Sequence, residues 1–327
     1  MPTYSAFGVS ILPCLRSSSQ SPACTRHSRH VPTASIAIVG TVPSTFAFGI
    51  LSPDVLPTDI SLKKAIQQHA EYCHALSKIP AISGLYQSPS NPAFPDGVFV
   101  EDPLVIISKR TAFMATAGHK SRDGERAALT SVLKRIGVVV RRAWDIRLDG
   151  GDVLKVPGFV VVGISERTES ASVEALQAAL DDEAAGDKRA PKAVPVAVID
   201  GLHLKSLVTW VGGVDASDHG FLVAPDDERG KQCLKRIQEA TGVSWDVLQV
   251  PEEERLAANM LFIPPRKDRY GSVAPGAVLV QRSCPISVKL LKEKVVAAGI
   301  EDIDVVAVDM SEMAKANGAL TCMSVII

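Results

Sequence analysis

The sequence predicts an α/β protein assembled from a repeated unit of strand, strand, helix and strand. Strand-length apolar runs alternate with helix-length amphipathic segments from residue 35 onward. This order recurs about every 50–60 residues, roughly five times, so a propeller or solenoid has to be considered before separate domains. The length of 327 residues alone gives a first expectation of about two domains. With 46% apolar and 22% charged residues and a mean hydropathy of +0.16, the chain can form a folded core.

The first two units follow from apolar periodicity and from breakers at their ends. A buried strand is expected at 35–40 and a helix at 59–78, with Pro57 before it and Thr58 as a possible cap. In the second unit, strands are expected at 98–107 and 112–115. A helix at 122–136 follows, with Gly137 ending it.

The later units repeat the same order. Strands are expected at 138–140, 153–154, 159–162, 194–199, 204–211, 220–223, 245–249, 259–263, 277–281, 303–308 and 320–327. Helices are expected at 170–180, 232–241, 286–298 and 311–316. Ser311 caps the last helix and Asn317–Gly318 ends it. Residues 181–192 and 215–220 are expected to be surface loops.

Charge and motif content exclude several classes of function. Lys plus Arg is 35 and Asp plus Glu is 36, so affinity for the phosphate backbone of nucleic acid is not expected. The most apolar stretch, 35–51, is interrupted by Gly40 and Pro43 and is too short for a membrane-spanning helix. The six cysteines form no Cys-x-x-Cys pair, which favours free thiols in a reducing compartment. Phosphate-binding glycine loops, a Gly-x-Ser-x-Gly elbow and His-x-x-x-His pairs are absent, so no cofactor and no metal are expected.

Residues 1–34 differ in composition from the rest of the chain. They contain no acidic residue, are dense in serine and threonine, and carry scattered positive charge at Arg16, Arg26 and Arg29. A disordered extension or a misassigned start codon is one interpretation. An organellar transit peptide is the other, since such segments are rich in Arg and Ser and poor in acids. The protein is therefore expected in the cytoplasm, or in a mitochondrion or plastid if this segment is a transit peptide.

Five residues with reactive or charged side chains lie in apolar surroundings: Glu101, Asp102, Asp149, His203 and Cys322. Each has an ordinary structural explanation: an acid pair at a strand edge, a turn, a core histidine, or a small buried thiol. Glu101 and Asp102 are adjacent in an expected strand, so they face opposite sides and one of them points inward. Together the five supply a thiol, an imidazole and carboxylates. That set suits attack of a thiolate on a cationic substrate.

Six short strings in order make the chain resemble the dimethylarginine dimethylaminohydrolases of the guanidino-group-modifying superfamily. They are FPDGVFVED at 94–102, LDGGDV at 148–153, SERT at 165–168, LHLKS at 202–206, AAN at 257–259 and LTCMS at 320–324. The Asp-Gly-Gly-Asp string is shared across the superfamily. The LHLKS and terminal LTC strings are more particular to the dimethylarginine hydrolases. The resemblance runs from about residue 35 to residue 327.

The resemblance implies a five-bladed α/β propeller with a central active site, formed by residues 35–327 as one catalytic domain. It also implies hydrolysis of asymmetric dimethylarginine or monomethylarginine to citrulline and a methylamine, through a covalent thiouronium. Cys322 would be the nucleophile. His203 would protonate the leaving amine and then activate water. Asp149 would be the triad carboxylate that contacts the guanidinium.

The resemblance assigns the remaining residues to substrate binding. Asp102 would also hold the guanidinium, and Asp96 would bind the α-amino group. Arg122 and Arg167 would bind the α-carboxylate, which distinguishes arginine derivatives from agmatine. Glu101 would lie in the same shell without an assigned role. The expected partner is thus a small-molecule methylarginine, with neither nucleic acid nor membrane, and the oligomeric state is left open.

Two departures from the family pattern keep alternatives open. Asn317 stands where the family often has Asp, five residues before the cysteine. The apolar region 41–53, expected to supply a lid loop, does not match in detail. One alternative is therefore an arginine deiminase or a hydrolase of another guanidine. A further alternative is a non-catalytic guanidine-binding protein, for which Cys322 would be dispensable.

Overall fold

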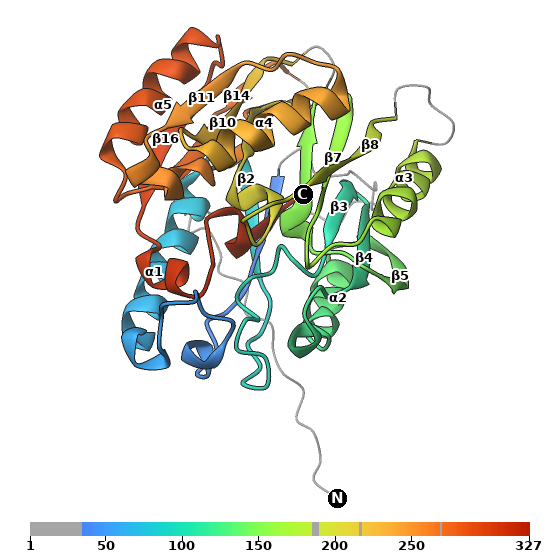
Figure 1. Ribbon diagram of the computed structural model, residues 1–327, viewed down its shortest axis with the longest axis vertical. Helices are drawn as coiled ribbons and strands as arrows, with labels where there is room; N and C mark the ends of the chain where they lie inside the picture. The colour runs from blue at the N-terminus through green and yellow to red at the C-terminus, as the bar shows by residue number, and fades with distance from the viewer. Residues whose placement is uncertain (1–34, 185–189, 216–217, 269) are drawn as a thin grey trace, which may run out of the picture.

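Five three-stranded sheets make up the core of the computed structural model, which describes residues 35–184, 190–215, 218–268 and 270–327 (Figure 1). In every sheet the first two strands are antiparallel, and the third is parallel to the second. A helix provides each parallel connection, as such connections require. The five-bladed α/β propeller predicted from the sequence is thereby confirmed. The interpretations of residues 1–34 lie outside the described residues, as does part of the expected loop at 181–192.

The blades follow one another along the chain. The first comprises β17 (Ser324–Ile326), β1 (Ser35–Val39), α1 (Leu62–Lys78) and β2 (Ile82–Gln87). The second comprises β3 (Val105–Ser108), β4 (Thr111–Thr116), α2 (Arg126–Arg135) and β5 (Val139–Arg147). The third comprises β6 (Val153–Val156), β7 (Phe159–Ile164), α3 (Ala171–Glu183) and β8 (Lys192–Ala197). The fourth comprises β9 (Thr209–Gly212), β10 (Gly220–Pro225), α4 (Glu228–Thr241) and β11 (Val247–Val250). The fifth comprises β12 (Leu261–Ile263), β15 (Gly276–Gln281), α5 (Pro285–Ala297) and β16 (Ile303–Val308).

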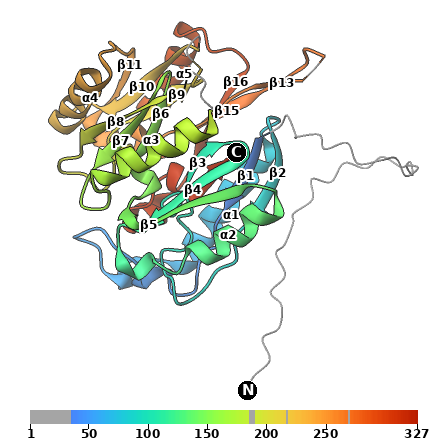
Figure 2. The ribbon, with the colours of Figure 1, turned by 90° about the vertical axis from the view of Figure 1, so that its right-hand side faces the viewer.

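The middle strand of each blade is largely buried, because it is covered on both faces. Val160, Val161 and Val162 of β7 are all buried, and so are the six residues of β15. The helices lie at the periphery of the molecule (Figures 1 and 2). Within the part of the chain that the structure describes, no helix is long and apolar enough to cross a membrane.

Helix α1 shows how the fold places the end of the chain. Ser61, not Thr58, caps it, and the Ser61 side chain accepts a hydrogen bond from the Lys64 N–H. The hydroxyl of its buried Tyr72 donates to the Leu320 carbonyl at 2.9 Å and accepts from Ser324 Oγ at 2.8 Å. Both partners flank the short 321–323 turn. The first blade therefore holds Cys322 in place through its helix.

Several expected strand segments are 3-10 turns or irregular backbone instead. Residues 98–104 form no strand, 204–206 form a 3-10 turn, and 321–323 form another. The apolar side chains there are buried, as Val98 and Leu204 are, but they belong to loops that cross the centre of the ring. Burial without strand pairing gives the same apolar pattern as a strand. Helices α1 and α2 also begin later than expected, and Met310, not Ser311, is the N-cap of α6 (Ser311–Lys315).

Candidate active site

One small cavity collects six of the eight residues assigned from the sequence. Asp96, Asp102, Arg122, Arg167, His203 and Cys322 line it, together with Ile50, Phe99, Leu202, Ala316 and Asn317. Its volume is about 20 Å³, which is room for a water molecule or two. Asp149 lies directly behind His203, whereas Glu101 is not part of the wall. Loops, not strands, supply these side chains: Arg122 and Arg167 lie on loops within a blade, and the others lie on loops between blades.

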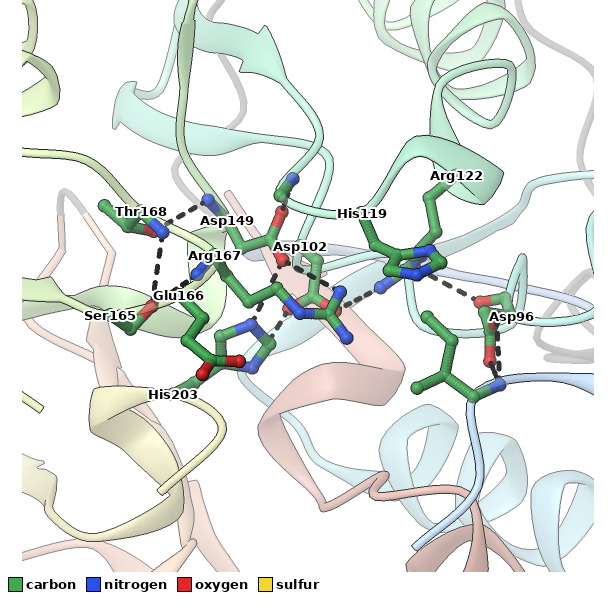
Figure 3. A network of polar contacts seen from close by, with 12 residues as sticks. Asp96, Asp102, His119, Arg122, Asp149, Ser165, Glu166, Arg167, Thr168 and His203 are labelled. Carbon is green, nitrogen blue, oxygen red and sulfur yellow. Dashed lines mark hydrogen bonds and ion pairs between the residues drawn. The ribbon is translucent and has the colours of Figure 1, made fainter. Parts of the chain in front are cut away.

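Asp149 fixes the orientation of the His203 ring (Figure 3). Its Oδ2 lies 3.1 Å from His203 Nε2, and its Oδ1 accepts a 2.8 Å hydrogen bond from the Gly118 N–H. Its own N–H donates to Thr168 Oγ1 at 3.1 Å. Asp149 is fully buried. A carboxylate held from three directions can keep the imidazole in one position during proton transfer.

Asp102 presents one free carboxylate oxygen to the cavity. Its Oδ2 accepts from Arg122 Nη1, whereas its Oδ1 is buried, makes no hydrogen bond, and lies 3.9 Å from His203 Nδ1. A buried carboxylate oxygen without a donor is costly, because charged acceptors need hydrogen bonds when water is removed. This oxygen is therefore ready to accept from a bound cation.

Three carboxylates determine the charge of His203. Burial by itself lowers the pKa of its ring, but Asp102, Asp149 and Asp152 outweigh that effect and raise the pKa from 6.5 to about 9. His203 is thus an imidazolium at neutral pH. Asp152 belongs to the same arrangement. It accepts from the Leu204 N–H at 2.8 Å and from Ser165 Oγ at 2.7 Å, and so ties both loops to the 150–152 turn.

The raised pKa of His203 should make stability depend on alkaline pH. The imidazolium stabilises the fold fully below pH 6.5, and this contribution disappears as pH rises through about 9. The loss should be on the order of 3 kcal/mol. Melting temperatures between pH 6 and pH 10 should therefore fall more for the parent protein than for His203→Gln. His119→Gln, which changes an exposed histidine, is the control. Equal slopes for the parent and His203→Gln would contradict the assigned pKa.

Arg122 is a buried cation whose donors are nearly all used. Its Nε and Nη2 donate to Glu125, Nη2 also donates to the Phe99 carbonyl at 2.9 Å, and Nη1 donates to Asp102. Only one N–H of Nη1 is left over. In this state Arg122 orients Asp102 and has little left to offer a ligand.

Arg167 and Asp96 also face the cavity, and they have more hydrogen-bonding groups available to a ligand than Arg122 has. The Arg167 guanidinium lies 3.8 Å from Asp149 Oδ2 and makes no hydrogen bond with any residue the structure describes. Both oxygens of Asp96 accept from the Ile50 N–H, at 3.0 and 3.3 Å. The cavity thus has a cationic group beside Asp149 and an anionic group at Ile50, matching the two charges of an amino acid.

Glu101 lies behind the turn Thr321–Met323 that carries Cys322, on the side away from the cavity. Its carboxylate accepts from Lys205 Nζ and, at 2.7 Å, from Thr321 Oγ1, while its N–H donates to the Cys322 carbonyl at 3.3 Å. The Asn259 side chain joins the same network, because its Nδ2 donates hydrogen bonds to Thr321 Oγ1 and to the Lys205 carbonyl. Glu101 therefore supports the backbone of Cys322 and does not face the cavity, which differs from the expectation that it shares the substrate shell.

The thiol of Cys322 is protonated at neutral pH. Burial, together with the negative charges of Asp102 and Glu101, raises its pKa well above the ordinary range. Cys322 lies on the 3-10 turn Thr321–Met323, and not within the expected strand 320–327. A thiol becomes a good nucleophile only as the thiolate. The site thus needs an added positive charge before Cys322 can attack.

The segment around Ile50 covers the cavity. Asn317 Nδ2 donates to the Ile50 carbonyl at 3.2 Å, and Ser52 Oγ donates to Asn317 Oδ1 at 2.8 Å. The Ser52 N–H donates to the Lys315 carbonyl at 2.9 Å. Asn317 has a φ of +55°, a left-handed conformation that asparagine tolerates better than most residues. These bonds hold residues 50–52 against the loop that carries Cys322.

Comparison with known proteins places the chain in a family. A scan against models of protein families finds no match. The N(G),N(G)-dimethylarginine dimethylaminohydrolase of Streptomyces coelicolor is 31% identical over 232 residues, which is 71% of this chain and 74% of that relative. The chain belongs to the dimethylarginine dimethylaminohydrolase family. The protein of the same name from Pseudomonas aeruginosa is 28% identical over 263 residues, 80% of this chain and 87% of its own.

Solved structures agree with this family in fold. A dimethylarginine dimethylaminohydrolase from Pseudomonas aeruginosa, a cysteine-to-serine mutant complexed with citrulline, superposes with a TM-score of 0.66 at 23% identity, over 89% of this chain and 98% of that one. The N-terminal domain of a cyanobacterial arginine dihydrolase superposes with a TM-score of 0.65 at 18% identity, over 89% of this chain and 97% of that one.

An arginine deiminase of Mycobacterium avium is 29% identical over 266 residues, 70% of this chain and 59% of its own. The dimethylarginine dimethylaminohydrolase fold is thus shared with enzymes named for arginine itself.

Several residues around the site had no role assigned from the sequence. Thr168, Lys205 and Asn259 lie inside strings that resemble dimethylarginine dimethylaminohydrolases, and that position was the available signal. Gly118 and Glu125 lie outside those strings. Asp102, Asp149 and His203 could each bring one ligand atom to a metal ion, but Arg122 and Arg167 beside them already supply positive charge. The absence of a metal stays a prediction.

Proposed function

We propose that this protein hydrolyses asymmetric dimethylarginine and monomethylarginine to citrulline and a methylamine. The observation that carries the proposal is the free Asp102 oxygen beside His203 and Cys322, in one small cavity. A guanidinium is a planar cation with several N–H donors, and a carboxylate oxygen without a donor is its natural partner. The thiol and imidazolium beside that oxygen can then perform the chemistry.

The amino-acid end of the substrate would bind at Arg167 and Asp96. Arg167 offers a guanidinium with free donors to the α-carboxylate, and Asp96 accepts from the α-ammonium in place of the Ile50 N–H. Arg122 would add its one remaining N–H and otherwise hold Asp102. The substrate class is therefore an arginine derivative with both α-groups.

Binding of the guanidinium would activate the nucleophile. Its positive charge beside Asp102 offsets the negative charges that keep Cys322 protonated, so the thiol pKa falls and its proton leaves to solvent. The thiolate attacks the guanidinium carbon and forms a C–S bond. The His203 imidazolium then donates its proton to the departing methylamine as the C–N bond breaks, leaving a thiouronium on Cys322.

Water completes the reaction at the same position. Neutral His203 accepts a proton from water as the oxygen attacks the thiouronium carbon. The C–S bond then breaks, the cysteine leaves as the thiolate, and the remaining hydroxyl proton passes to solvent as the C=O of citrulline forms. Asp149 keeps the imidazole oriented in both steps, because its contacts to Gly118 and Thr168 do not involve the substrate.

Entry of a substrate requires residues 50–52 to move, because the cavity holds no more than a water or two. Ser52→Ala removes the hydrogen bond to Asn317, worth about 1 kcal/mol. The open state should become roughly fivefold more populated. Limited chymotrypsin cleavage after the exposed Phe48 should accelerate by that factor. Ser131→Ala, at an exposed serine of α2, is the control, and equal cleavage rates in the parent and Ser52→Ala would contradict the role of this bond.

Replacing Arg167 should separate binding from chemistry. Arg167→Met keeps the length of the side chain and removes the charge. KM for dimethylarginine should rise about 10²-fold or more while kcat changes far less, because a charge-assisted pair to the α-carboxylate is lost. Arg142→Met, at an exposed arginine on β5, is the control. A large fall in kcat with unchanged KM would show that Arg167 acts on the reacting centre instead.

Product analysis tests the function directly. The purified protein is incubated separately with asymmetric dimethylarginine and with arginine, and citrulline, dimethylamine and ammonia are measured. Citrulline with dimethylamine from the first substrate, and little product from the second, supports the proposal. Citrulline with ammonia from arginine would support the second candidate, an arginine hydrolase, which the match to an arginine deiminase favours. If neither substrate yields citrulline, both candidate functions are overturned.

A further inference from the structure

A second and larger cavity lies on the side of the Thr321–Met323 turn that faces away from the Cys322 cavity. Its volume is about 390 Å³, and the first strand of every blade contributes to its wall. Most of the wall is apolar, with Val105, Trp210, Phe262 and Val325 among its side chains. Glu101 lines it as well and bonds to the Cys322 backbone, so this wall reaches the nucleophile from behind. Cavities of roughly 300–1,000 Å³ with mostly apolar walls and a few polar groups are typical of small-molecule sites.

Two cations in this wall have no carboxylate partner among the residues that the structure describes. Lys155 Nζ donates to the Ile106 carbonyl. Burial, and secondarily the charge of Lys205, lowers the pKa of Lys155 to about 8. Arg266, on the β13 strand (Arg266–Lys267), has a buried Nη1 that makes no hydrogen bond. A buried cation without a counter-charge is unfavourable, so both groups are suited to bind an anion.

The charges and the wall together select the ligand class. Lys205 is paired with Glu101, so Lys155 and Arg266 are the two cations of this wall without a carboxylate among the described residues. The two oxygens of one carboxylate can contact both cations. The planar guanidinium of Arg266 matches a carboxylate in geometry. The apolar wall matches a hydrocarbon body and would disfavour an inorganic anion, which has none.

We propose that this cavity binds a small organic carboxylate with an apolar body, whose carboxylate contacts Arg266 and Lys155. The site is distinct from the Cys322 cavity, since the two share none of their lining residues. The proposal stands independently of the reaction at Cys322. The hairpin of β13 and β14 (Val273–Ala274), which pairs Arg266 with Ala274, projects from the fifth blade and carries one of the two cations (Figure 2).

Calorimetric titration of the full chain with octanoate tests the site. Saturable binding is expected for the parent, and Arg266→Met or Lys155→Met should weaken it at least about tenfold, since each removes a charge-assisted contact. Lys267→Met, which changes an exposed cation next to Arg266, should leave the affinity within about twofold. Octan-1-ol should bind much more weakly than octanoate, and so should sulfate.

Two further measurements keep the result interpretable. Arg167→Met must bind octanoate as the parent does, because a loss there would mean that octanoate occupies the Cys322 cavity. Circular dichroism melting of Lys155→Met and Arg266→Met establishes that both variants are folded. Without ligand, Lys155→Met should melt no lower than the parent, because an unpaired charge is removed. Absent saturation with the parent, or equal affinity in both cavity variants, would overturn the proposal.

Discussion

Cys322→Ser should reduce citrulline formation from asymmetric dimethylarginine at least about 10⁴-fold. A serine hydroxyl in this position would stay protonated, because the bound guanidinium can lower the pKa of a thiol into reach but not that of an alcohol. The substrate should still bind, since Asp102, Arg167 and Asp96 are unchanged. The measurement is steady-state citrulline production, with binding followed separately by calorimetry.

Cys73 offers a matched control for this experiment. It is a half-buried thiol whose Sγ lies 3.7 Å from His69 Nδ1, so the chain contains a thiol–imidazole contact outside the Cys322 cavity. Burial lowers the pKa of His69 to about 4 and raises that of Cys73 to about 12, which leaves both groups neutral. Cys73→Ser should keep activity within about twofold. Retention of full activity in Cys322→Ser would instead show that another group is the nucleophile. Absence of activity in the parent, with guanidine binding equal in the parent and in Cys322→Ser, would favour a non-catalytic, guanidine-binding protein.

Asp149→Asn should lower kcat about 10²- to 10⁴-fold, the range that general acid–base catalysis contributes. The amide would lose the charge that helps to keep His203 protonated and would weaken the 3.1 Å contact to Nε2. The pKa of His203 should fall below about 9. Activity that depends on the imidazolium is lost as pH rises through that pKa. The alkaline limb of the kcat/KM profile should therefore move to lower pH.

Asp145→Asn, which changes an exposed carboxylate on β5, is the control for that variant. It should leave both kcat and the pH profile unchanged. If Asp149→Asn lowers kcat without moving the alkaline limb, Asp149 acts on the substrate and not through His203. That outcome would contradict the role derived from its hydrogen bonds.

Elements that obey a regular period were predictable from the sequence. The strand at 303–308 is observed at its expected bounds as β16, and the repeated unit gave the five blades. The segments 98–104, 204–206 and 321–323 were not predictable as loops, because buried irregular backbone carries the same apolar residues as a strand. These three segments hold Glu101, Asp102 and Cys322, and His203 directly precedes the second of them. Catalytic loops that cross a core therefore look like strands in the sequence.

The candidate site likewise contains residues that the sequence could predict and contacts that it could not. Cys322, His203 and Asp102 could be assigned because they lie in recognisable strings. The location of Glu101 behind Cys322 depends on a bond to Thr321 that joins residues 220 positions apart. Likewise, Asn317 and Ile50 meet over 267 positions. Local spacing contains no information on such distant pairs, so the cover over the cavity and the support beneath the nucleophile appear only in the folded chain.

The pairing of β17 with β1 has a consequence for the order of folding. Ala37 pairs with Ile326, so the first blade receives its inner strand from the opposite end of the chain. This contact has the highest cost in loop closure, which places it late in folding. Until β17 docks, one side of β1 stays an open strand edge that other chains can pair with. The same event brings the adjoining Cys322 turn to His203. A growing chain is therefore inactive, and at risk of aggregation, until its final strand closes the ring.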